Sequence, residues 1–364
     1  MAAVSWIAGL EGRSADPDGE GARGGLAMPS DGPHREPLLE GSMPDHQAGM
    51  DRALGGLAGL LPLLVFLLAA TPGFAATITI DYRFDQSGFF DPTHATGLLA
   101  RTRMQQAAGI FSGLLLDPLD AITPGGRSHG VTDRWTAFFT DPATGGNAAT
   151  ADLALAADEI LVFVGARDLG GSVLGQGGFG GWSASGSPSF LTSLDGRGQP
   201  GSGLTDFGPW GGSISFDAVG TRWYFGAAAD VARGTTDFLS VALHELAHVL
   251  GVGTAGSWSA QVGAAPACAS GSGFFGAHTM AVSGGPVCLD AGAAHFEEGT
   301  RAGGHEAALD PTLATGSRKL LTPLDLAALA DVGWQLSVPE PPLGLMLLAG
   351  WGLLCGQRRR HLAS

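Results

Sequence analysis

The sequence predicts a layered α+β fold for residues 77–336 of the 364-residue chain. Of all residues, 45% are hydrophobic and 15% are charged, which supplies apolar surface for a core and excludes a solvated disordered chain. Segments that alternate apolar and polar residues occur together with segments of helical spacing. Their order, strand, helix, strand, strand and helix, is typical of helices packed on a sheet.

The first three predicted elements lie in the amino-terminal half of this region. Residues 77–82 alternate with period two, which predicts a strand. Apolar residues recur at near-helical spacing over residues 94–116 and predict an amphipathic helix. The continuous apolar run over residues 160–166 is typical of a strand buried on both faces.

Four further segments complete the prediction. The Gly/Ser-rich stretch 170–203 is expected to be a loop, and alternation returns over residues 211–217, which predicts another strand. Residues 236–252 have a strongly helical pattern. A last helix is expected to begin at Thr322, because Thr is a favourable N-cap and the next residue is proline.

Both ends of the chain have the character of targeting segments. Residues 1–49 have no apolar periodicity and are expected to be disordered or to lie upstream of a true start at Met50. Residues 50–76 carry a charged start, an uncharged apolar run and a small-residue end, which predict a secretory signal peptide. The alternative for this segment is a transmembrane anchor with a cytoplasmic tail.

Residues 337–364 contain a Val-Pro-Glu-Pro-Pro motif, an apolar run over residues 343–356 and three consecutive arginines. This segment resembles the PEP-CTERM sorting tail of Gram-negative bacteria. The resemblance implies processing by an exosortase-type sorting machinery, transient membrane association through the tail, and export to the bacterial envelope, the extracellular matrix or the medium. The alternative is an ordinary short carboxyl-terminal anchor.

Charge and cysteine content agree with an exported protein. The net charge of −15 would repel a phosphate backbone, so nucleic acid is not expected as a partner. Cys268 and Cys288 are the cysteines of the mature body, and two exported cysteines most simply form one disulfide. The alternative, a pair of metal-binding thiols, lacks the CxxC spacing of such sites.

The strongest chemical signal lies in the helix predicted over residues 236–252. His244 and His248 are four residues apart and therefore share one helix face, where both can bind one metal ion. Glu245 lies beside the first of them and can act on water without binding the metal. Zn²⁺ suits imidazole ligands and activates water near neutral pH. The alternative is a pair of solvated histidines on a surface helix.

The motif continues to Gly251 and resembles that of the metzincin metallopeptidases, whose third histidine follows three positions later. This chain has Thr254 there. In the leishmanolysin-like branch the third histidine follows an insertion, and His295, followed by an aromatic residue and Glu298, is similar to that segment. The resemblance therefore assigns zinc to His244, His248 and His295. The disulfide would brace the insertion that delivers His295. The alternatives are His278, His305, Thr254, or no third ligand.

The resemblance also implies an architecture. It predicts a twisted mixed sheet with the active-site helix in a catalytic subdomain, residues 77–255, and a smaller, mostly irregular subdomain, residues 256–336. Leu309 stands where relatives place the methionine beneath the metal, and leucine can fill the same apolar volume. The strand around residues 210–217 is expected to be the sheet edge that binds an extended substrate.

These inferences predict an exported zinc-dependent endopeptidase that binds protein or peptide substrates, with Glu245 as general base. The alternative is a non-catalytic cell-surface or matrix binding protein that retains the metzincin fold, which Thr254 and Leu309 would favour. A third reading is an adhesive, lectin-like Gly-rich shell.

Overall fold

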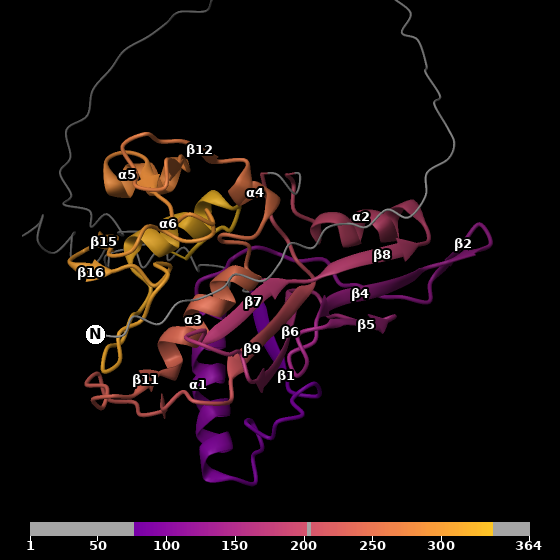
Figure 1. Cartoon of the computed structure of the whole chain (residues 1–364). Coiled ribbons are helices and arrows are strands. Elements are labelled where there is room, and N and C mark those ends of the chain that lie inside the picture. The colour runs from indigo at the N-terminus through magenta and orange to yellow at the C-terminus, as the bar shows by residue number, and fades with distance from the viewer. Residues whose placement is uncertain (1–75, 202–204, 338–364) are drawn as a thin grey trace, which may run out of the picture. The chain divides into compact units, whose positions relative to one another are not determined.

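The structure is a computed structural model that describes residues 76–201 and 205–337 (Figure 1). Helices and several small sheets give these residues an α+β fold, as predicted. The predictions for residues 1–49, for the signal peptide and for the sorting tail lie outside the described residues, apart from the end residues Ala76 and Ser337. In the described ranges, no helix combines the length and the hydrophobicity that a bilayer span requires.

The central sheet has four strands in the order β1 (Thr77–Asp81), β6 (Glu159–Arg167), β9 (Gly211–Asp217) and β7 (Gly175–Phe179). The first three strands are parallel, and β7 runs antiparallel to β9, so the sheet is mixed. The middle seven residues of β6 are all buried. This confirms the prediction of a strand covered on both faces.

The residues of β6 alternate between two hydrophobic cores. Val162 and Val164 belong to the core formed with helices α1 (Ala95–Ser112) and α3 (Phe238–Val249). Leu161 and Phe163 belong to a second core on the opposite face. The sheet therefore separates a helical layer from a second layer, because successive strand residues point to opposite faces.

The second layer contains a three-stranded sheet in the order β5 (Asn147–Ala151), β4 (Arg134–Thr140) and β8 (Gly181–Ser185). Helix α2 (Pro188–Gly196) packs its Phe190 and Leu194 into the same core. The prediction that residues 170–203 form a loop is therefore wrong, because β7, β8 and α2 all lie within that stretch.

The glycines of β7 explain why a Gly-rich segment forms a strand here. A Cβ on Gly177 would lie 2.6 Å from the carbonyl oxygen of Glu245, and one on Gly175 would lie 2.5 Å from the Glu245 carboxylate. Glycine at both positions therefore lets α3 approach the backbone of β7 more closely than any other residue would.

The prediction that residues 210–217 form the sheet edge is also wrong. Strand β9 pairs with β6 on one side and with β7 on the other. All seven of its residues are buried. Among the described residues, β7 pairs with β9 alone, so β7 is the edge strand beside α3.

Residues after α3 form short elements around the carboxyl-terminal side of the fold. Cys268 and Cys288 form a disulfide, as predicted, with an S–S distance of 2.06 Å. Helix α6 has the predicted N-cap, since the Thr322 hydroxyl accepts a hydrogen bond from the Asp325 N–H. The elements of this region are α4 (Gly256–Ser259), β12 (Val262–Ala264), β13 (Ser272–Phe274), α5 (Ala277–Ser283), β14 (Val287–Cys288), β15 (Arg301–Ala302), β16 (His305–Glu306) and α6 (Pro323–Asp331).

Two helices end earlier than the sequence predicts. Helix α1 ends at Ser112, and α3 occupies only Phe238–Val249 of the predicted range 236–252. Gly251 follows α3 with φ 98°, which permits the sharp turn expected there. The remaining strands are β2 (Arg127–Ser128), β3 (Val131–Thr132), β10 (Trp223–Tyr224) and β11 (Thr236–Asp237).

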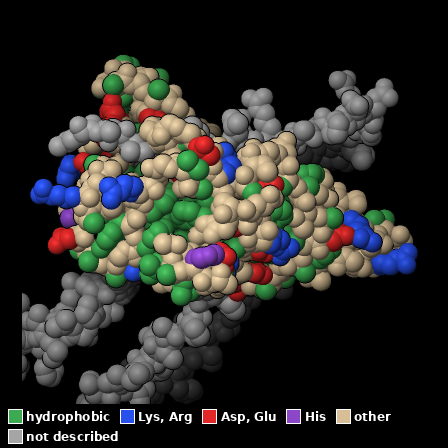
Figure 2. All heavy atoms as spheres, turned by 60° about the horizontal axis from the view of Figure 1, so that its bottom comes forward, with side chains coloured by type: hydrophobic (Ala, Val, Ile, Leu, Met, Phe, Trp, Pro, Cys, Tyr) green, Lys and Arg blue, Asp and Glu red, His purple; other side chains and the backbone are tan. Residues whose placement is uncertain are grey.

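The surface shown in Figure 2 is mostly uncharged. Acidic and basic side chains are scattered over it, including beside the histidine in the lower middle of the view, and hydrophobic side chains gather left of its centre. Leu98 and Leu99 of α1 are exposed, at 54% and 45%. Single exposed apolar residues of this kind are normal for a soluble surface.

We expect Gly177→Ala to destabilise the protein, because its Cβ would collide with the backbone of Glu245. Overpacking of this kind costs about 1–3 kcal/mol of unfolding free energy. Gly181→Ala in β8 is the matched control, since a Cβ at Gly181 meets nothing within 4 Å. Chemical denaturation of both variants measures the effect, and equal midpoints would show that β7 does not pack this closely on α3.

Candidate metal centre

Helix α3 lies in the interior of the fold. All twelve of its residues are buried, and it contacts α1, β7 and β9. Its amino-terminal end is held by Asp237, which accepts a hydrogen bond from the Ser240 N–H and pairs with Arg318 at 2.6 Å. Polar side chains on such a helix require partners, because burial without them is costly.

Three histidines converge on one point beside α3. Nε2 of His248 lies 3.0 Å from Nε2 of His244 and 3.1 Å from Nε2 of His295. His244 and His248 are fully buried, and His295 is 3% exposed. One ligand atom from each lies within 4.8 Å of the others, so this group could hold a metal ion.

The other ring nitrogen of each histidine contacts an acceptor. Nδ1 of His244 lies 2.7 Å from the Ala308 carbonyl oxygen, and Nδ1 of His248 lies 2.8 Å from that of Val252. Nδ1 of His295 lies 3.1 Å from Oδ2 of Asp290. A carbonyl or carboxylate oxygen only accepts hydrogen bonds, so Nδ1 carries the proton in each ring.

In a neutral ring, a proton on Nδ1 leaves a lone pair on Nε2. Burial lowers the pKa of His244 well below its usual value and that of His248 to about 3, so both rings are neutral at physiological pH. Two neutral rings with bare Nε2 atoms 3.0 Å apart repel rather than form a hydrogen bond. A cation between the two rings would attract both lone pairs and remove this repulsion. Neutral imidazole with a free lone pair is the species that binds metals.

The segment that carries His295 is a hairpin anchored by the disulfide. Cys288 in β14 accepts a hydrogen bond at 2.8 Å from the Glu297 N–H, and Leu289 pairs with Phe296 across a bridge. The peptide N–H of Asp290 donates to the His295 carbonyl at 2.9 Å. The disulfide therefore holds the base of the hairpin, and His295 lies at its far end.

Asp290 is a residue in contact with the histidine group that the sequence analysis missed. Its carboxylate accepts hydrogen bonds from the N–H groups of Ala294 and His295 as well as from the His295 ring. Burial alone would raise its pKa, but the bonds from His295 hold the pKa below its usual value. The only signal in the sequence is an aspartate five residues before the ligand candidate.

A second missed residue, Asp325, fixes the segment behind His244. Its two carboxylate oxygens accept hydrogen bonds from the N–H groups of Ala308 and Leu309, both at 3.0 Å. The Ala308 carbonyl binds His244, and the Leu309 carbonyl accepts from the Phe296 N–H at 3.0 Å. This segment therefore supports two of the three histidines. The Leu309 side chain is buried in the main core.

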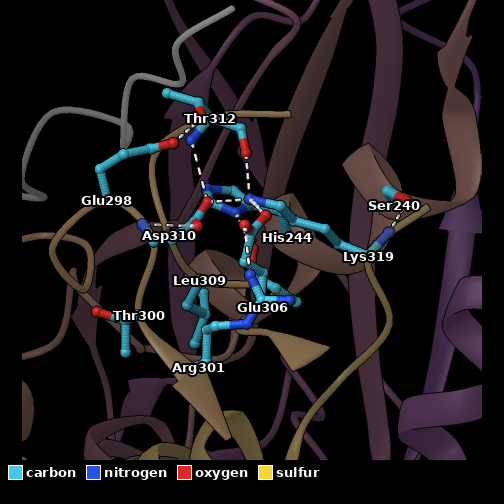
Figure 3. A network of polar contacts seen from close by, with 12 residues as sticks. Ser240, His244, Glu298, Thr300, Arg301, Glu306, Leu309, Asp310, Thr312 and Lys319 are labelled. Carbon is cyan, nitrogen blue, oxygen red and sulfur yellow. Dashed lines mark hydrogen bonds and ion pairs between the residues drawn. The ribbon is translucent and has the colours of Figure 1, made fainter. Parts of the chain in front are cut away.

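A buried ion pair adjoins the same segment (Figure 3). Lys319, 7% exposed, donates to the fully buried carboxylate of Asp310 and lies 3.3 Å from Oε2 of Glu306. Its own N–H donates to the Ser240 hydroxyl of α3 at 2.8 Å. These contacts tie residues 306–319 to the amino-terminal end of α3, and the positive charge of Lys319 contributes to the lowered pKa of His244.

Glu245 lies beside the histidines without joining their group. Its side chain is fully buried against Gly175 and Gly177, and within the described part of the chain neither carboxylate oxygen makes a hydrogen bond. Burial raises its pKa well above the usual value, and the backbone of Gly177 opposes this. Burying a carboxyl group without a hydrogen-bond partner is costly, and groups of this kind cluster at functional sites.

The alternative third ligands lie outside the group. The Thr254 hydroxyl donates to the His248 carbonyl at 2.7 Å and so caps the helix end. His278 in α5 and His305 in β16 are both exposed. Of the candidates raised from the sequence, the structure brings together His244, His248 and His295.

Comparisons with known protein families, with curated proteins and with solved structures find no match to this chain. Whatever the centre does must therefore be inferred from its own residues.

Proposed function

We propose that this chain is an exported zinc-dependent endopeptidase of the metzincin type. The observation that carries the proposal is the convergence of three buried Nε2 atoms, with His248 3.0 and 3.1 Å from the other two. His244, His248 and His295 would hold the ion. Two nitrogens bound to one tetrahedral zinc lie about 3.3 Å apart, which is close to both separations.

The donor set supports zinc among divalent ions. Three imidazole nitrogens suit zinc, whereas calcium and magnesium prefer oxygen ligands. Three protein ligands with one further position are typical of catalytic rather than structural zinc sites. When bound, zinc supplies Lewis-acid catalysis, polarising a carbonyl group and activating water near neutral pH.

Glu245 would move the proton in this reaction. Its carboxylate lies one residue from His244 and uses neither oxygen for a hydrogen bond within the described residues. Burial raises the pKa of Glu245, and the positive charge of a nearby zinc ion would favour its ionised form. In that form an oxygen of Glu245 can accept the proton of the attacking water, and the resulting carboxyl group can donate it to the amine nitrogen that leaves. Peptide bond hydrolysis requires both transfers, and a single side chain can perform them in turn.

The edge of β7 suits an extended peptide substrate. Strand β7 has one partner strand among the described residues, so the main-chain groups on its other side can pair with an added chain. Gly175 and Gly177 of this strand contact Glu245. A peptide paired with β7 would therefore lie beside the proposed general base.

Export remains part of the proposal and is supported by the disulfide. The bond between Cys268 and Cys288 is of a kind that persists in oxidising compartments. The proposed exosortase and membrane partners depend on the sorting tail, which lies outside the described residues.

Zinc binding should depend on His295 and not on His278. We expect His295→Ala in the full-length protein to weaken zinc affinity at least about 100-fold, since a ligand is lost from a three-ligand site. His278→Ala is the matched control, because that exposed histidine lies outside the group. Metal content and chelator competition measure both, and unchanged affinity in His295→Ala would remove it from the ligand set.

Cleavage should depend on Glu245 while zinc binding does not. We expect full-length Glu245→Gln to retain zinc and to cleave casein at least about 100-fold more slowly than the wild type, because general acid–base catalysis is lost. A chelator should abolish wild-type cleavage, and added zinc should restore it.

The same assay decides between the two functions. If the wild-type protein holds stoichiometric zinc and leaves casein intact, the chain is the non-catalytic binding protein. If Glu245→Gln cleaves at the wild-type rate, Glu245 is not the general base.

A further inference from the structure

We infer that Asp290 is a positioning residue that selects the metal-binding tautomer of His295. This inference rests on the proposed metal function of the three histidines. The Asp290 side chain would orient the ring of His295, the proposed third ligand, and would affect the metal only through that ring.

The three histidines differ in how their Nδ1 protons are held. Backbone carbonyls of Ala308 and Val252 hold those of His244 and His248, and no substitution removes these acceptors. His295 alone depends on a side chain, with Nδ1 lying 3.1 Å from Oδ2 of Asp290. The tautomer of the third ligand is therefore set by residue type at position 290.

Asp290 also closes the turn that presents His295. Its Oδ1 accepts hydrogen bonds from the N–H groups of Ala294 at 3.1 Å and His295 at 3.3 Å. Ala293 within this turn has φ 54°, a left-handed conformation that is costly for alanine. The Trp258 indole donates to the Ala293 carbonyl at 2.8 Å and helps to hold it.

The hairpin around this turn has supports that do not involve the Asp290 side chain. The disulfide anchors Cys288, and Leu289 and Phe296 pair through their backbones. Phe296 is fully buried in the main core. The effect of position 290 on the His295 ring can therefore be separated from its effect on the fold.

Asparagine at position 290 has too few hydrogen-bond acceptors to bind all three N–H groups that Asp290 binds. The carboxylate accepts three N–H groups with its two oxygens. Asparagine has one accepting oxygen, and if that oxygen keeps the two backbone N–H groups, its NH₂ group faces Nδ1 of His295. Nδ1 must then accept, which moves the ring proton to Nε2. A protonated Nε2 in a neutral ring cannot bind a metal.

Alanine at the same position acts differently. Asp290→Ala removes all three acceptors, so it should destabilise the turn more than asparagine does. It leaves Nδ1 without a competing donor, so the metal-binding tautomer stays accessible. A tautomer role therefore predicts that asparagine harms zinc binding more than alanine, whereas a purely structural role predicts the reverse.

The experiment measures zinc affinity by chelator competition for full-length wild type, Asp290→Asn and Asp290→Ala. We expect Asp290→Asn to bind zinc about 10–100-fold more weakly than the wild type, as for other groups that orient metal ligands. Asp290→Ala should lie between the two. Thermal unfolding of the metal-free proteins should place the two variants in the opposite order, with Asp290→Ala less stable than Asp290→Asn and the wild type most stable.

A matched control and a spectroscopic readout complete the test. Asp91 pairs with the exposed His94 ring at 3.2 Å, away from the three histidines, so Asp91→Asn should leave zinc affinity unchanged. Nitrogen NMR of histidine-labelled, metal-free protein should show the His295 proton on Nδ1 in the wild type and on Nε2 in Asp290→Asn.

Each outcome decides the inference. Wild-type affinity in Asp290→Asn, an affinity loss that follows the loss of stability, or an unchanged tautomer would overturn it while the zinc site stands. A wild-type protein that binds no zinc would instead overturn the proposed function, so the two failures are distinguishable.

Discussion

Three buried imidazole rings direct their Nε2 atoms at one point beside α3. The two Nε2 atoms of neutral His244 and His248 repel without a cation, because they lie 3.0 Å apart and water does not screen them. The fold therefore has to hold the rings from outside. It does so with an acceptor on each Nδ1: two backbone carbonyls and the carboxylate of Asp290. Two of the three histidines share a helix, and the third lies 47 positions after His248.

The part of the site that the sequence predicts is the part that local geometry determines. Residues four apart on a helix share a face, so His244 and His248 required no knowledge of the rest of the chain. His295 could be named only through a resemblance, since nothing local places it near α3. Asp290 and Asp325 were missed for a related reason. Their roles come from hydrogen bonds to backbone groups that meet only in the folded chain.

In the fold, too, the elements that the sequence predicts correctly are those with a local sequence signal. A continuous apolar run identified β6, and a Thr-Pro pair identified the start of α6, because both signals act within a few residues. The Gly-rich stretch 170–203 predicts a loop, but it contains β7, β8 and α2. In β7, glycine is required because α3 packs closely against the strand at Gly175 and Gly177. No property of the stretch alone distinguishes these two uses of glycine.

The position of β7 also determines which strand forms the unpaired edge of the sheet beside α3. Serines at alternate positions gave residues 211–217 the look of a half-exposed strand, yet Ser213 and Ser215 are buried, and the Ser215 hydroxyl donates to the Pro142 carbonyl. The unpaired edge therefore lies one strand further out, on β7. That strand is also the one that contacts Glu245 of α3, so a peptide paired with β7, as proposed, would lie beside the proposed base. Side chains at Gly175 and Gly177 would push α3 away, so glycine at both positions keeps Glu245 close to the backbone of β7.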